Sequence, residues 1–166
     1  QFSPCLAGNK MNWQGLTIEF LWPNLPIAQH NDDSCVIKIS DGQRSVLLTG
    51  DISKKIEQRL IKQSNSNIGN VIVNLQADIL VVPHHGSKTS SSPAFIEHVS
   101  PQYAVFSAGY LNRWKMPVNS IVKRYHQRGG NTLNTAENGM IQFFIAPEGI
   151  KLKTYRQDIW PFWFAN

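Results

Sequence analysis

The chain has 166 residues, of which 42% are hydrophobic and 16% charged, a charged fraction below the roughly 25% typical of globular domains. This length suits one domain, and no run of about 18 apolar residues, as a membrane-spanning helix requires, occurs in it. Residues 100–166 hold eight Lys or Arg against three acidic residues, so they carry the whole net charge of +5. Such an excess favours anionic partners such as nucleic acid or lipid headgroups, although ordinary solubilising charge is the alternative.

The first half of the chain predicts strands followed by one helix. Residues 1–11 read as irregular, and the alternating residues 16–23 predict a strand that ends at Pro23. Residues 34–51 predict a hairpin around Asp41-Gly42, a strong turn signal. Residues 52–63 place apolar side chains at helical spacing after Ser53, a suitable N-cap.

The second half predicts alternating strands and helices. The short apolar run 77–83 suits a strand that is buried on both faces. Ser92 and Pro93 predict a helix over 92–100, a strand follows over 102–109, and residues 117–130 predict a helix that ends at a Gly pair. Short strands are expected over 132–157. This order predicts an α/β fold in which helices pack on a mixed sheet.

Polar side chains of metal-binding type follow two of the predicted strands. Asp51 comes directly after one buried strand, and His84 and His85 follow another. Sites in layered α/β folds form beyond the carboxyl ends of strands, and carboxylate and imidazole are ligands of zinc, manganese or iron. The alternatives are a helix-capping turn for Asp51 and structural roles for the histidines. The hydroxyl run over 87–92 suits either a helix cap or a phosphate site.

Four motifs occur in the order found in the ComEC family of competence proteins, which this chain resembles. They are NDDSCVIKISDGQRSVLLTGDI, ADILVVPHHGSKTSSS, SPQYAVFSAGYLNRWKMP and TLNTAENGMIQF. The resemblance covers roughly residues 1–160 and concerns the metallo-β-lactamase-like domain of the family. It implies that residues 1–166 form the C-terminal portion of one such domain, a partial αββα sandwich of mixed sheets with flanking helices. Gln1 begins without a signal peptide, so we expect the chain to be part of a longer protein.

The resemblance also implies roles for individual residues. Asp51 and His84 would bind a divalent metal, zinc or manganese, with His84 preferred because it lies nearer the strand end. His85, Ser87 and Lys88 would position phosphate or stabilise charge. Three residues of the loop before the hairpin stand where relatives place another histidine ligand, and would contact metal weakly or not at all: Asn31, Asp32 and Asp33.

Two departures from the family pattern bear on activity. The first metal-binding motif, of the type His-x-His-x-Asp-His, is absent from this sequence, and Lys115-Met116 stand where many members have His before the proline. The chain alone is therefore expected to be inactive as a nuclease and to bind metal poorly or not at all.

The family imports single-stranded transforming DNA through an inner-membrane channel, and this domain is proposed to degrade the strand that is not imported. The resemblance therefore implies single-stranded DNA and the channel part of the parent chain as partners, no small-molecule cofactor, and a periplasmic location. A non-catalytic DNA-guiding domain and a hydrolase of another ester, such as a lactone, remain open as alternatives.

Two further sets of residues carry predictions. Arg113, Trp114 and Lys115 would bind single strands, because an aromatic ring between two cations can stack a base; the alternative places Trp114 in the core. The spacing of Cys5 and Cys35 is compatible with two free thiols and with one disulfide bridge. The periplasmic location that the resemblance implies favours a disulfide between them.

Overall fold

The computed structural model describes residues 4–25, 30–65 and 73–159. Its main sheet has seven strands that follow one another across the sheet in sequence order. These strands are β1 (Lys10–Trp13), β2 (Leu16–Trp22), β3 (Val36–Ser40), β4 (Ser45–Leu48), β5 (Ile79–Val81), β6 (Tyr103–Phe106) and β7 (Asn131–Asn134). The pairs from β1 to β4 are antiparallel, whereas β4 to β7 run parallel. The predicted mixed sheet is confirmed.

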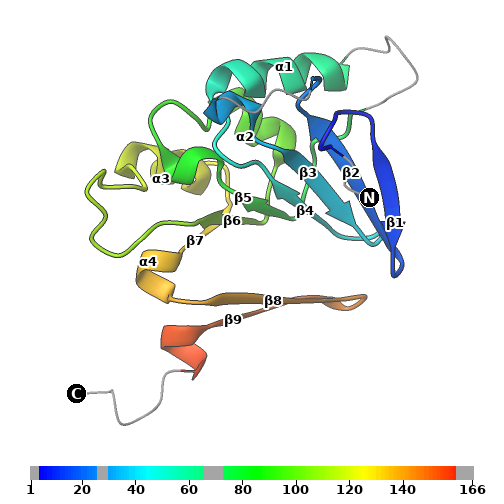
Figure 1. Cartoon of the computed structure of the whole chain (residues 1–166). Coiled ribbons are helices and arrows are strands. Elements are labelled where there is room, and N and C mark those ends of the chain that lie inside the picture. The colour runs from blue at the N-terminus through cyan, green and yellow to red at the C-terminus, as the bar shows by residue number, and fades with distance from the viewer. Residues whose placement is uncertain (1–3, 26–29, 66–72, 160–166) are drawn as a thin grey trace, which may run out of the picture.

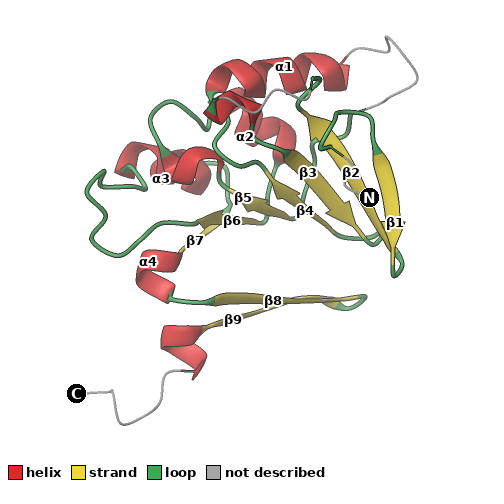
Figure 2. Cartoon of the chain, in the orientation of Figure 1, coloured by secondary structure: helices red, strands yellow, loops and turns green. Residues whose placement is uncertain are grey.

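Helices cover one face of this sheet and a hairpin lies on its other side (Figures 1 and 2). The covering helices are α1 (Lys54–Asn65), α2 (Pro93–Val99) and α3 (Asn119–His126), whereas the short α4 (Thr135–Asn138) lies between β7 and the hairpin. The hairpin consists of β8 (Ile141–Ala146) and β9 (Gly149–Thr154). Three single turns complete the described elements: η1 (Asn31–Asp33), η2 (Pro83–Gly86) and η3 (Tyr155–Ile159). The order of helices, large sheet and small sheet agrees with the α/β sandwich expected from the sequence.

The predicted caps begin the two helices that flank the site. The Ser92 hydroxyl accepts a hydrogen bond from the Phe95 amide, and Pro93 occupies the first turn of α2. The Ser53 hydroxyl accepts from the Lys55 amide at 3.3 Å at the start of α1. These bonds satisfy amides that have no partner within the helix, so the helices begin where the sequence predicts.

The core lies between the sheet and helices α1, α2 and α3. Alternate strand residues face it, because side chains of a strand point to opposite faces in turn. The largest fully buried side chains include Leu47 and Leu80 from the sheet, Phe95 from α2 and Tyr125 from α3. The opposite face of the sheet carries apolar side chains that are half-buried, among them Ile37, Ile39, Val46, Leu48 and Val81. Tyr103 on this face contacts Phe143 of the hairpin, with ring centroids 5.3 Å apart.

Two local predictions were wrong. Residues 10 and 11 were expected to be irregular but belong to the edge strand β1, which pairs with β2 and joins Lys10 Nζ to Glu19 Oε1 at 3.0 Å. All four residues of β1 are exposed, so no buried side marks the strand in the sequence. The helix α4 also interrupts the predicted run of strands, because the Asn134 side chain accepts a hydrogen bond from the Ala136 amide. Among the described residues, no helix combines the length and the apolar character needed to span a membrane.

Candidate metal centre at the sheet edge

The carboxyl ends of the parallel strands β4, β5 and β6 meet at one edge of the sheet. Asp51 follows β4, His84 and His85 follow β5, and Ser107 follows β6. Because β4 pairs with β5 and β5 with β6, these residues lie on three adjacent strand ends. The edge thus brings together the carboxylate and the imidazoles that the sequence singles out, at the place where α/β folds build sites.

His85 is the imidazole that faces Asp51. Its Nε2 lies 3.4 Å from Asp51 Oδ1, and both side chains are partly exposed. On the other side of the ring, Nδ1 lies 2.6 Å from the carbonyl oxygen of Ser107. A carbonyl only accepts hydrogen bonds, so Nδ1 carries the proton. In the neutral ring the lone pair is then on Nε2, directed toward Asp51. This is the arrangement of a metal-binding histidine whose second nitrogen is held by a carbonyl.

His84 faces away from this pair toward the hydroxyl run. Its Nδ1 lies 3.3 Å from Thr89 Oγ1, and its ring centroid is 6.5 Å from that of His85. The expectation that His84 is the ligand used distance along the chain from the strand end. The structure places His85 rather than His84 within reach of Asp51, and the choice between them stays a prediction.

Both histidines have left-handed backbone conformations, with φ of 51° at His84 and 55° at His85. This region costs a non-glycine residue about 1–2 kcal/mol, so two successive residues there are held by their surroundings. The His84 amide donates to the Gly50 carbonyl at 3.0 Å, beside Asp51, and the Val118 amide donates to the Gly86 carbonyl at 3.1 Å. These bonds tie the backbone of the turn to the loops on both sides of it.

The loop before β3 holds the backbone at Asp51 and Ser53 by hydrogen bonds. The Ser34 hydroxyl accepts a hydrogen bond from the Asp51 amide at 3.0 Å. Asp32 Oδ1 accepts from the Ser53 amide at 2.8 Å, while its backbone carbonyl accepts from Trp22 Nε1 at 2.6 Å. The Asp32 carboxylate, suggested as a weak metal contact together with Asn31 and Asp33, is therefore engaged in holding the start of α1.

The hydroxyl run over 87–92 is largely a structural network. Ser90 and Ser91 are fully buried, and the amides of Ser91 and Ser92 donate to the carboxylate of Glu57 in α1. Burial raises the pKa of Glu57 despite these bonds. The Tyr125 hydroxyl donates to Ser91 Oγ at 3.0 Å. The surplus of hydroxyl residues thus anchors the histidine turn to two helices.

Ser87 and Lys88 differ in how accessible they are. Ser87 is only 8% exposed, and its hydroxyl lies 3.1 Å from that of Thr89. Lys88 is exposed, and its backbone carbonyl accepts from Lys54 Nζ at 2.7 Å. The Lys88 side chain is therefore accessible to a ligand, whereas the Ser87 side chain is nearly buried. Their predicted roles stay predictions.

The candidate DNA-binding residues lie on the loop that follows β6. Trp114 is 63% exposed, so the alternative that places it in the core is wrong. The Arg113 guanidinium stacks on the Trp114 ring, 4.2 Å from its centroid, and Lys115 is also exposed. The three side chains are accessible to a ligand, as the nucleic-acid prediction requires.

Cys5 and Cys35 form a disulfide, with their Cα atoms 6.0 Å apart. This meets the geometric requirement for a bridge. The bridge fastens the segment before β1 to the residue that precedes β3, and the backbone bonds from Ala7 N to Pro23 O and from Gly8 N to Phe20 O hold the same segment.

Among residues 4–25, 30–65 and 73–159, no group of three or more His, Cys, Asp or Glu side chains could hold a metal ion. At this edge the described part of the chain brings together one pair of ligand-type side chains, Asp51 and His85. The Ser107 carbonyl is the one functional group that the sequence did not indicate. Any residue offers the same carbonyl, so only its place after a buried strand could have marked it.

No family model matches the chain. Recombination protein 2 of Haemophilus influenzae is 36% identical over 163 residues, which are 98% of this chain and 19% of that protein. Competence protein ComA of Neisseria gonorrhoeae is 36% identical over 151 residues, 90% of this chain and 21% of that protein. The solved structure of the metallo-beta-lactamase fold protein YhfI from Bacillus subtilis is 15% identical, with a TM-score of 0.45 over 80% of this chain and 50% of YhfI.

The sequence matches run along nearly the whole chain, and the chain spans about a fifth of the length of the curated relatives it matches. The four motifs recognised in the sequence lie within the matched residues. The chain belongs to the ComEC family of competence proteins, of which it represents one segment.

Proposed function

We propose that this chain is part of a metal-dependent phosphodiesterase domain that acts on DNA during its uptake. The observation that carries the proposal is the 3.4 Å separation of Asp51 Oδ1 and His85 Nε2. Zinc–ligand distances of about 2.0–2.1 Å at a tetrahedral angle separate a nitrogen from an oxygen ligand by about 3.3 Å. The pair therefore fits two neighbouring positions around one divalent ion, zinc or manganese.

Asp51 and His85 are the right types of ligand for such an ion, but two ligands are too few to form a complete site. A metal site typically has three or more protein ligands, and the described residues offer two. Under this proposal the remaining ligands come from a part of the parent protein other than these residues. The half-exposed Asp51 and His85 side chains leave one side of the pair open to receive them.

The chemistry of the site then divides among a few groups. A bound divalent ion lowers the pKa of its water and polarises the phosphate. Asp51 and His85 would hold the ion, and the Ser107 carbonyl would keep the His85 ring in its binding tautomer. His84 lies at the same edge and could hydrogen-bond the phosphate or the leaving oxygen. The exposed Lys88 would add positive charge near the phosphate.

The relatives' names and the disulfide support a cellular setting for this function. Competence and recombination proteins match nearly the whole chain, which supports a role in DNA uptake with single-stranded DNA and the membrane-channel part of the same parent protein as partners. Disulfides persist in oxidising compartments. The Cys5–Cys35 bridge therefore supports a location on the periplasmic side of the inner membrane.

Metal titration of the chain tests the ligand pair without requiring activity. We expect weak, saturable binding of Mn²⁺ or Zn²⁺, measured by calorimetry, and its loss in Asp51→Asn and in His85→Gln. His98→Gln is the matched control, because His98 sits on α2 with Nδ1 bonded to the Ala94 carbonyl. His84→Gln should bind as the unaltered chain does. If Asp51→Asn binds the metal as the unaltered chain does, the proposed metal site is ruled out.

A DNA-guiding role without catalysis is the second candidate. The absence of a third ligand among the described residues favours it. The two functions separate in the parent protein, because only the enzyme would need Asp51 to degrade a strand. A parent protein with Asp51→Asn that supports normal strand degradation would favour guidance.

Salt dependence tests the exposed loop after β6 in either case. Each phosphate contact to a single strand contributes about −0.7 to the slope of log affinity against log salt. The double variant Arg113→Gln/Lys115→Gln should therefore bind an oligonucleotide more weakly and with a slope shallower by about 1.4. Lys55→Gln/Lys62→Gln, which removes the same charge from exposed positions of α1, is the control. Equal slopes in the two variants would exclude a specific role for the loop.

A further inference from the structure

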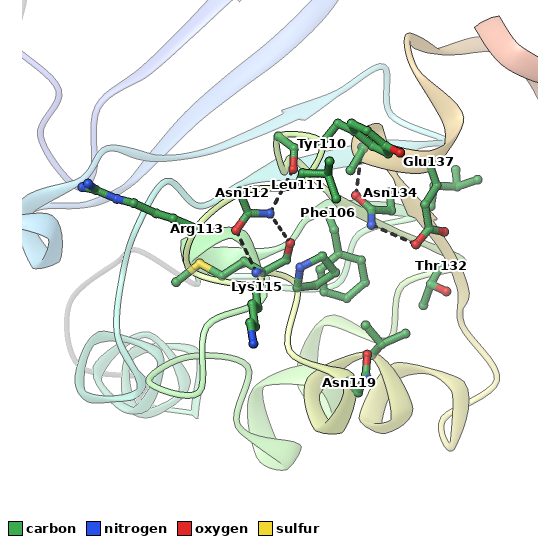
Figure 3. A pocket seen from close by; sticks show the side chains of 16 residues that line it. Phe106, Tyr110, Leu111, Asn112, Arg113, Lys115, Asn119, Thr132, Asn134 and Glu137 are labelled. Atoms are coloured by element: carbon green, nitrogen blue, oxygen red, sulfur yellow. Dashed lines mark hydrogen bonds between the residues drawn. The ribbon is translucent and has the colours of Figure 1, made fainter.

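A cavity of about 650 Å³ lies beside the candidate metal centre, at the ends of the next strands of the sheet. Its walls are the end of β6, the loop after it, the first turn of α3, and β7 with α4 (Figure 3). Cavities of roughly 300–1,000 Å³ hold small organic ligands. The size therefore suits a single nucleotide or its base.

The cavity and the metal centre share one short piece of backbone. The Ser107 carbonyl holds His85, and the neighbouring residue Phe106 lines the cavity. The site residues follow β4, β5 and β6, and the cavity residues follow β6 and β7, so both lie along one edge of the sheet. A chain-like ligand lying along this edge would meet the metal centre and the cavity in succession.

The loop that walls the cavity is held in shape without a ligand. The Asn112 amide donates to the carbonyls of Gly109 at 2.9 Å and Met116 at 2.6 Å. Its side-chain oxygen accepts from the Met116 amide at 2.9 Å. Figure 3 shows this amide at the centre of the loop. Such preorganisation reduces the entropy that binding must remove.

The lining combines an apolar floor with a polar rim. The half-buried Pro117 and Leu133 supply apolar surface on which a flat ring can lie. Tyr110 lines the rim and is 69% exposed, with the Arg156 guanidinium 5.6 Å from its ring centroid. An exposed aromatic ring at the lip of a cavity, with cations nearby, is the usual platform on which a base stacks.

The cavity wall also carries a hydrogen-bond acceptor. The Glu137 carboxylate lines the cavity from α4, and the Asn134 amide donates to its Oε1 at 3.4 Å. Each of the four DNA bases has an N–H group on its pairing edge. A carboxylate can accept from any of them, so the cavity would take bases without selecting one sequence.

We infer that this cavity holds one base of the single strand whose phosphate lies at the Asp51–His85 site, with Tyr110 stacking on that base. The inference rests on the proposed function, to which it adds a base-binding position on the strand. Lys115 at the rim would contact the flanking phosphate.

Two oligonucleotides of equal length, one of thymidylate and one abasic, separate base from backbone binding in chelator-containing buffer. Tyr110→Leu should bind the thymidylate strand about tenfold more weakly and the abasic strand unchanged. Tyr110→Phe keeps the ring and should bind both strands as the unaltered chain does. Ala136→Phe, which fills the cavity from α4, should repeat the pattern of Tyr110→Leu.

Three results would overturn the inference. The first is an equal loss of affinity for the thymidylate and the abasic strand. The second is unchanged affinity for both strands in both Tyr110→Leu and Ala136→Phe. The third is full competition by free thymidine monophosphate at the concentration of the strand. The last would make the cavity a site for free nucleotides. Because these measurements contain no metal, their failure leaves the Asp51–His85 proposal standing, and loss of that proposal in the metal titration leaves the base measurement valid.

Discussion

Gly86→Ala is expected to lower the free energy of unfolding by about 4 kcal/mol. Gly86 has φ of +81°, and a Cβ built on it would lie 2.7 Å from the Phe106 ring and 2.8 Å from Pro117 Cβ. The left-handed conformation accounts for about 1–2 kcal/mol and the forced contact for about 1–3 kcal/mol. Phe106 is almost fully buried, so its ring has little room to move aside.

Gly129→Ala is the matched control for this change. Gly129 has nearly the same φ, +78°, but a Cβ there meets no atom within 4 Å. Urea unfolding should therefore show a loss of about 1 kcal/mol for Gly129→Ala. If the two variants unfold at the same urea concentration, the close packing of the histidine turn against β6 is not real. That result would also weaken the placement of His85.

Removing the Cys5–Cys35 disulfide is expected to lower stability by about 3.6 kcal/mol. The bridge closes a loop across a sequence separation of 30 residues, and in the chain-entropy model a loop of this length restricts the unfolded chain by that amount. The double variant Cys5→Ser/Cys35→Ser measures the loss, and treatment of the unaltered chain with a reductant should give the same unfolding midpoint.

Either single serine variant is the control for the disulfide, because it removes the bridge and leaves one thiol. Its stability should equal that of the double variant. A double variant as stable as the unaltered chain would show that the bridge does not form, and free thiols in the unreduced, unfolded chain would show the same directly. Both outcomes would also withdraw the support that the bridge gives to a periplasmic location.

Local signals in the sequence predicted most of the fold. The Asp41-Gly42 turn joins β3 and β4, and the serine caps begin α1 and α2 because capping depends on neighbouring residues alone. The edge strand β1 escaped prediction because its side chains are all exposed, and pairing with β2 rather than hydrophobic pattern makes it a strand. The strand conformation of β1 therefore depends on its tertiary contacts rather than on its own sequence.

The site was predictable in position but not in detail. Asp51 and the histidine pair follow buried strands, so their meeting at one edge could be expected. Which imidazole faces Asp51 depends on the left-handed backbone angles at His84 and His85, and the residue types there do not predict those angles. The exposure of Trp114 was equally hidden, since an aromatic residue in a loop can lie in the core or on the surface. Packing by distant segments settles such questions.

The left-handed conformation of His84 and His85 opposes thermal stability to the proposed role of the imidazoles. Glycine adopts this conformation freely and asparagine more readily than histidine. Selection for stability alone would therefore replace His84 and His85 by those residues and relax the turn. We expect directed evolution for heat resistance alone to replace the two histidines. Selection for ligand binding should retain them and should gain stability through substitutions elsewhere in the fold.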